Sequence, residues 1–81
     1  MSKEIRMVTL NRIKCCLLRI FEAEDDDIPN RKIIGANNRA LDYYLKDYSE
    51  TEKDELLRLI RWTNDDNASN LEKHGWRVIR R

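Results

Sequence analysis

Residues 33–48 read IIGANNRALDYYLKDY, and their large apolar side chains recur at helical spacing. At 3.6 residues per turn, one face of this segment carries Ile34, Leu41, Tyr44, Leu45 and Tyr48. The charged side chains spread over the other face. This pattern is typical of an amphipathic helix packed on a core, so we expect it to be the central helix of a small fold.

Gly35 leaves two arrangements of this segment open. A glycine inside a helix costs about 1 kcal/mol relative to alanine, and it is also typical of turns. We favour one unbroken helix, with Asp27 as its N-cap and Pro29 near its first helical position. In the alternative, a turn at Gly35 separates a helix over 30–34 from a second helix over 37–48.

A first helix is expected upstream, because apolar residues recur at steps of three and four from Leu10 to Phe21. Thr9 or Asn11 could cap its start, and we expect it to end near Ala23. The acidic run that follows and Pro29 then break the helical pattern.

Two further helices are expected downstream of the central one. Ser49 followed by Glu52 is a capping-box signature, which predicts a third helix from about residue 50 to 63 that turns back against the central helix. A short fourth helix over about 68–74 is expected to end at Gly75. The segments 5–8 and 76–81 have strand-like composition and could pair as a two-stranded ribbon.

The sequence therefore predicts an all-α fold: a single domain over 1–81, with three main helices, a short fourth and at most a minor terminal ribbon. We expect a helix content above about 40%, against a globular average of roughly one third. The predicted core consists of Leu17, Ile20, Leu41, Leu45, Leu56 and Ile60.

Composition narrows the class of protein. The 81 residues are 41% hydrophobic and 38% charged, with a net charge of +1, which gives little drive for non-specific nucleic-acid binding. We find no membrane-spanning stretch and no secretory signal, so we expect a cytoplasmic protein. The adjacent Cys15 and Cys16 are expected to be free thiols, with Cys16 facing the core.

Catalysis is not predicted. The single histidine, His74, stands at a helix end beside Gly75, where a capping role is usual. Asp25, Asp26 and Asp27 could attract a divalent cation, but they lack the ligand spacing of a calcium loop, so we interpret them as a solvated loop. We therefore expect no enzyme activity, catalytic residue, cofactor or metal.

Residues 28–46 resemble the helix-turn-helix of small transcriptional regulators when Gly35 is placed in the turn. The resemblance implies a DNA-binding regulator in which Asn37, Asn38 and Arg39 begin the recognition helix and contact base edges. The first helix of the pair would be about three residues shorter than in that family. Nucleic acid is therefore the alternative partner.

The end of the chain, residues 71–80, is similar to the helix-glycine-strand ending of very-short-patch-repair-type endonucleases. In a helical chain of this size, the residues upstream leave no room for the acidic catalytic core of such enzymes. We therefore interpret this ending as a local packing unit.

Protein binding is the function we favour from the sequence. Separated acidic and basic segments on a near-neutral helical domain are typical of a small regulator, adaptor or inhibitor of a larger protein machine. Such chains are common among phage and plasmid regulators, including anti-CRISPR-type inhibitors. The candidate partner-binding residues are two aromatics off the main stripes and the acidic run: Tyr43, Trp62, Asp25, Asp26 and Asp27.

Overall fold

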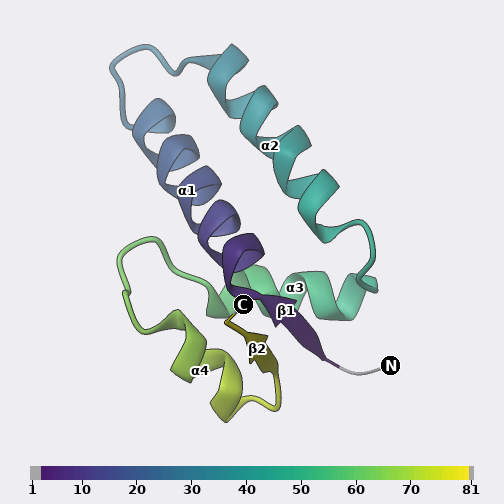
Figure 1. The fold of residues 1–81 in the computed structure, drawn as a ribbon. Helices are drawn as coiled ribbons and strands as arrows, with labels where there is room; N and C mark the ends of the chain where they lie inside the picture. Colours follow the sequence, from purple (N-terminus) through teal and green to yellow (C-terminus); the bar gives the residue numbers. More distant parts are fainter. Residues whose placement is uncertain (1–2, 81) are drawn as a thin grey trace.

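The computed structural model describes residues 3–80, and helices account for 64% of them. Four helices lie between two short strands (Figure 1). In chain order the elements are β1 (Glu4–Arg6), α1 (Met7–Glu24), α2 (Arg31–Leu45), α3 (Glu50–Leu59), α4 (Asn67–Lys73) and β2 (Arg77–Ile79). The predicted helical fold with a minor ribbon is confirmed; residue 81, the end of the predicted second strand segment, lies outside the described residues.

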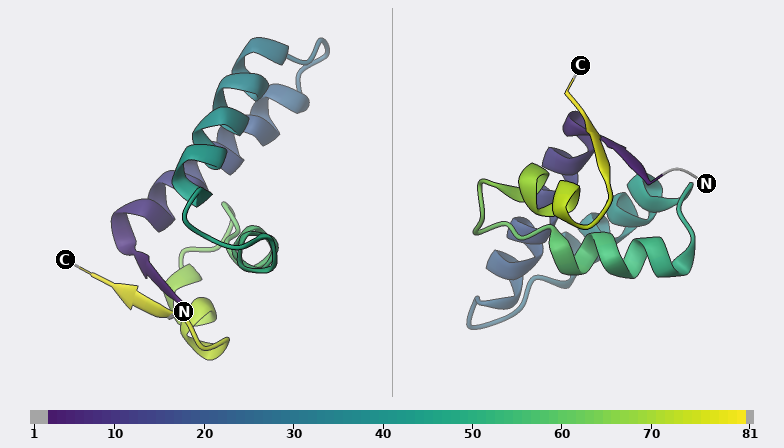
Figure 2. Two further views of the ribbon diagram at one scale, coloured as in Figure 1. Left: turned by 90° about the vertical axis from the view of Figure 1, so that its right-hand side faces the viewer. Right: turned by 90° about the horizontal axis from the view of Figure 1, so that it is seen from below.

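The elements form a long helical hairpin on a smaller base. The helices α1 and α2 lie side by side and make the most extensive contact in the fold. The helix α3 crosses beneath them, and α4 and the ribbon complete the base (Figures 1 and 2). The prediction that the third helix turns back along the central helix is wrong. The hydroxyl of Tyr48 donates to the Glu4 carbonyl over 2.7 Å, which ties the turn between α2 and α3 to β1 in the base.

The helix α1 begins at Met7, directly after β1. Its N-cap is Arg6, with extended backbone and no side-chain capping bond, so the predicted caps at Thr9 and Asn11 are wrong. The first turn is instead held by packing, because β1 leads straight into the helix and Leu10 is buried in the core. Tertiary contacts here replace a local capping signal.

The helix α2 passes through Gly35 without a break, as favoured from the sequence. Its N-cap is Asn30 rather than Asp27: the Asn30 side chain accepts from the Ile33 N–H over 3.2 Å. Residues 25–28 form bends, so Asp27 lies too far upstream to reach the first turn. Both residues are of types that cap helices well, and the path of the loop decides between them.

The boundaries of α3 and α4 follow specific capping residues. Ser49 and Glu52 form the predicted capping box, with bonds of 3.2 and 2.9 Å. The helix α3 ends at Leu59 rather than near residue 63, because Ile60 is extended. After α4, Gly75 has a φ of 88°, and the Trp76 N–H returns to the Leu71 carbonyl over 3.0 Å. This Schellman ending is the conformation that favours glycine.

The two strands pair in parallel, with Ile5 opposite Val78. Both side chains are buried. A parallel pair needs a long crossover, and here the whole chain between the strands supplies it. The ribbon therefore closes the base by joining the two ends of the described chain.

The core is larger than the sequence predicted. Leu41, Leu45, Leu56 and Ile60 are buried as expected, whereas Leu17 and Ile20 are only partly buried and pack against its edge. The base adds a set of buried residues that includes Ile5, Leu10, Ile13, Leu71, Trp76 and Val78. These come largely from the terminal segments, so the ribbon is an integral part of the core.

Candidate functional site

A groove lined by apolar and charged side chains lies between the second half of α1 and the turn that follows α3. Its volume is about 420 Å³. We call it the Trp62 groove, and it is lined by Leu17, Ile20, Phe21, Glu24, Leu57, Arg58, Ile60, Arg61, Trp62 and Thr63.

Two aromatic rings are part of the lining of this groove. The ring centroids of Phe21 and Trp62 are 4.7 Å apart, with a tilt of 36° between the rings. Phe21 remains 47% exposed and Leu57 38% exposed, although both are large apolar side chains. Such a pair is worth about 0.5–1.5 kcal/mol beyond its buried area. The fold thus positions an aromatic pair and leaves part of it open to solvent.

The turn that carries Trp62 is held by the buried side chain of Asn67. Its oxygen accepts from the Arg61 N–H over 3.0 Å. Its amide group donates to the carbonyls of Arg61 and Asn64 over 2.9 and 2.8 Å. One side chain therefore satisfies three backbone groups, which fixes the turn against α4.

Charged side chains line the rim of the Trp62 groove. Arg58 and Arg61 stand on the α3 side, and Glu24 stands on the α1 side. Within residues 3–80 none of these three forms an ion pair. Their charges are therefore available to a bound partner.

The structure separates the residues predicted to bind a partner. Trp62 lines the groove, and Asp25, Asp26 and Asp27 continue from Glu24 into an exposed loop beside it. Tyr43 lies away from the groove, on α2. It is 64% exposed, and the Lys46 ammonium lies 4.6 Å from its ring centroid. The predicted set therefore falls on two separate parts of the surface.

The helix-turn-helix arrangement is contradicted by the structure. Gly35 lies inside α2, so Asn37, Asn38 and Arg39 occupy the middle of a helix rather than the start of one. Asn37 is buried, and its side chain donates to the Ile33 carbonyl over 2.8 Å. Asn38 and Arg39 are exposed. Asn37 therefore cannot reach a base edge from this position.

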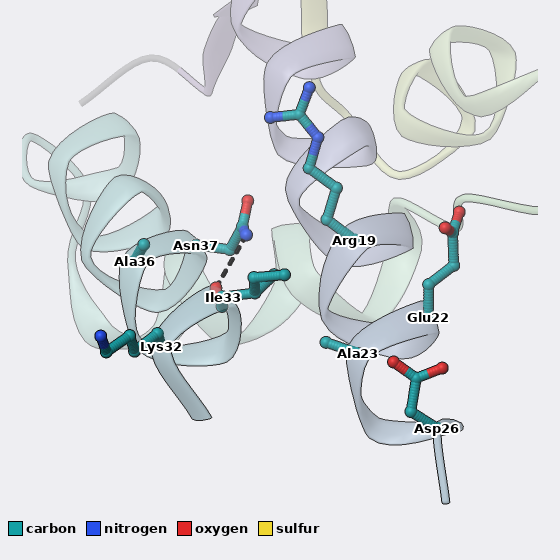
Figure 3. A pocket seen from close by; sticks show the side chains of 8 residues that line it. All are labelled: Arg19, Glu22, Ala23, Asp26, Lys32, Ile33, Ala36 and Asn37. Atoms are coloured by element: carbon teal, nitrogen blue, oxygen red, sulfur yellow. Dashed lines mark hydrogen bonds between the residues drawn. The ribbon is translucent and has the colours of Figure 1, made fainter. Parts of the chain in front are cut away.

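A second hollow of about 600 Å³ lies between the upper parts of α1 and α2 (Figure 3). It is lined by both charges and apolar groups: Arg19, Glu22, Ala23, Asp26, Lys32, Ile33, Ala36 and Asn37. The Arg19 side chain extends along α1 away from the end where Glu22 and Asp26 lie (Figure 3). Lys32 lies on the α2 side of the hollow, opposite Glu22 and Asp26 on the α1 side (Figure 3), so both signs of charge line it.

The histidine, the two cysteines and Tyr48 lie outside these hollows or are accounted for by the packing of the fold. Nδ1 of His74 lies 2.8 Å from the Asn70 carbonyl at the end of α4, which matches its expected capping position. Burial raises the pKa of the Cys16 thiol and of the Tyr48 hydroxyl. Cys16 is buried and Cys15 exposed, as predicted, and both are free.

Within residues 3–80, no three His, Cys, Asp or Glu side chains are grouped so that they could hold a metal ion. No helix in the described part combines the length and apolar character of a membrane span.

Comparison with protein-family models, curated proteins and solved structures finds no match to this chain.

Sequence reasoning placed Phe21 in the apolar stripe of the first helix and so missed its part in the groove. Its position immediately after Ile20 sets it about 100° around the helix, at the edge of the buried face. This position at the edge of the buried face is what indicates, in the sequence, that Phe21 is partly exposed. The contact with Trp62 depends on the loop path, which no local pattern indicates.

Proposed function

We propose that this protein is a small, non-enzymatic, cytoplasmic binding module that regulates, links or inhibits a larger protein machine. In kind it would be like the small inhibitors and adaptors of phages and plasmids. The observation that carries the proposal is the Phe21–Trp62 pair, which lines a surface groove with Phe21 47% exposed. Aromatic side chains in such positions are the usual anchors of protein interfaces.

The charges around the groove support this function. Arg58 and Arg61 line one side of the groove and Glu24 lines the other, so the groove presents both signs of charge to a partner. Such an arrangement speeds association and fixes the orientation of docking more than it raises affinity. A near-neutral protein with this polarity fits a protein partner better than a polyanion.

The proposal is tested by affinity capture from a host lysate with the wild-type chain and two matched variants. Trp62→Ala removes the anchor in the groove, and Tyr43→Ala removes an exposed aromatic elsewhere on the surface. We expect one large partner to be captured by the wild type and by Tyr43→Ala, and to be lost with Trp62→Ala. Loss with Tyr43→Ala alone would move the interface to the outer side of α2.

A mobility-shift assay on duplex DNA tests the alternative partner. We expect negligible duplex binding at physiological salt. Duplex affinity tighter than about 1 μM, the limit of ordinary non-specific binding, together with no captured protein, would contradict the proposal. Arg39→Ala would then decide whether the exposed middle of α2 contacts the DNA.

A further inference from the structure

A third hollow, on the other side of α1 from the Trp62 groove, has a volume of about 570 Å³. Arg19 and Phe21 are two residues apart, so they project about 200° from each other around the helix. We call this site the arginine hollow, and it is lined by Met7, Val8, Asn11, Arg12, Cys15, Cys16, Arg19, Tyr44 and Arg80.

The charged side chains that line this hollow are all positive. Arg12, Arg19 and Arg80 line it, and none of its lining residues is acidic. Arg80 forms an ion pair with Glu72 over 2.8 Å, so its charge is partly offset, although its other N–H groups are free of this bond. Arg19 forms no ion pair within the described chain. The net charge of the whole protein is only +1, so Arg12 and Arg19, with the partly offset Arg80, are a local concentration of positive charge.

Two of the arginines, Arg12 and Arg19, lie on one face of α1. Arg12 and Arg19 are seven residues apart, which sets them on the same face about 10.5 Å apart along the axis. The Arg12 guanidinium lies 6.0 Å from the ring centroid of Tyr44 and donates to its hydroxyl over 3.5 Å. This contact directs one guanidinium along the wall of the hollow.

The rest of the hollow is apolar and open. Val8 is 47% exposed there, and Met7 and the partly buried Tyr44 ring form further apolar surface beside the arginines. The volume falls in the usual range for small-molecule sites, roughly 300–1,000 Å³. An anion with an attached flat apolar group would therefore match both parts of the surface.

We propose that the arginine hollow binds a nucleotide phosphate, with the arginines holding phosphate oxygens and the base lying against Val8 and Tyr44. Arginine suits this chemistry because its planar fork donates two parallel hydrogen bonds to a phosphate. Basic side chains beside an aromatic ring are also the recurrent arrangement for nucleotides of a single strand. The phosphate could come from a free nucleotide or from a short single strand.

The test is an NMR titration of the full chain, observing backbone amides and the arginine Nε–H groups. The probes are ATP, a single-stranded tetranucleotide of adenines, and inorganic phosphate. We expect saturable shifts at Arg12 and Arg19 with a Kd below about 1 mM for ATP or the tetranucleotide, and weaker binding of phosphate. If ATP binds more tightly than the tetranucleotide, the ligand is a free nucleotide; if the tetranucleotide binds more tightly, the ligand is a single strand.

Two matched variants assign the binding to this hollow. Arg19→Gln removes a guanidinium with no hydrogen bond to another side chain, so the fold should persist, and affinity should fall about tenfold or more. Arg58→Gln, across the molecule in the Trp62 groove, should leave affinity within about twofold. The amide spectrum of each variant checks its fold.

Three results would overturn the proposal. The first is the absence of saturable shifts up to about 5 mM of either nucleotide probe. The second is an equal loss of affinity in both variants. The third is inorganic phosphate binding as tightly as ATP and the tetranucleotide, which would show that the apolar wall contributes nothing.

Discussion

The ring of Trp62 lies against that of Phe21, with 4.7 Å between their centroids, and this contact joins the hairpin to the turn after α3. The contact leaves Phe21 47% exposed, so part of the pair stays open to solvent. An aromatic pair of this kind is positioned before a partner arrives. Binding through it would therefore lose little side-chain entropy.

The turn that positions Trp62 should depend on Asn67. Asn67→Ala removes the three hydrogen bonds to Arg61 and Asn64, and we expect it to lower the free energy of unfolding by about 1–3 kcal/mol. The Arg61 amide should also lose protection in hydrogen exchange. Asn38→Ala, on the exposed surface of α2, is the control and should change neither quantity. Unchanged protection of Arg61 would show that the turn is held by other contacts.

The buried face of α2 should be essential to stability. Leu45 is 3% exposed, so Leu45→Ala should cost about 2–5 kcal/mol, a large part of the total for a domain of this size. Leu57→Ala is the matched control, because Leu57 is 38% exposed and should cost far less. Urea unfolding followed by circular dichroism measures both. Equal urea midpoints for the two variants would show that Leu45 does not lie on the buried face of α2.

Stability should fall in acid through Glu55. Its carboxylate accepts from the Lys3 ammonium over 2.8 Å and from the Trp76 indole, and the Lys3 bond is the main reason that its pKa lies below the ordinary value. A lowered folded pKa stabilises the fold above the unfolded pKa of about 4.3, and this contribution is lost as the pH falls through the folded value.

Glu55→Gln tests this assignment. The glutamine can still accept the indole hydrogen bond but does not titrate. Thermal unfolding between about pH 6 and 2 should therefore show a shallower loss of stability than in the wild type. Parallel pH profiles for the two proteins would assign the acid sensitivity to other carboxylates.

How far the sequence predicts this structure depends on whether the signal is local. The capping box at Ser49 and the glycine at Gly75 were predicted correctly, because each depends on residues a few positions apart. Leu41 and Leu45 were placed on the buried face by helical spacing alone. These features need no knowledge of the tertiary fold.

Other features depend on contacts between distant segments. Ile5 and Val78 belong to the core only because the two ends of the described chain pair in parallel, which no local pattern specifies. With that ribbon in the base, Leu10 is fully buried, while Ile20 lies at the edge of the core. The candidate site follows the same rule: Trp62 was identified from its exposure off the helical stripe, but its pairing with Phe21 required the loop path.

Site-specific photo-crosslinking tests the central claim, that the Trp62 groove is a protein interface, most directly. A benzophenone amino acid replaces Leu57 inside the groove or, as the matched control, Tyr43 on the outer side of α2. Irradiation in host lysate should give one discrete adduct of a larger protein from position 57 and none from position 43. Trp62→Ala in the same chain should abolish that adduct. Adducts of equal yield from both positions, or an adduct at position 57 that survives Trp62→Ala, would contradict the claim.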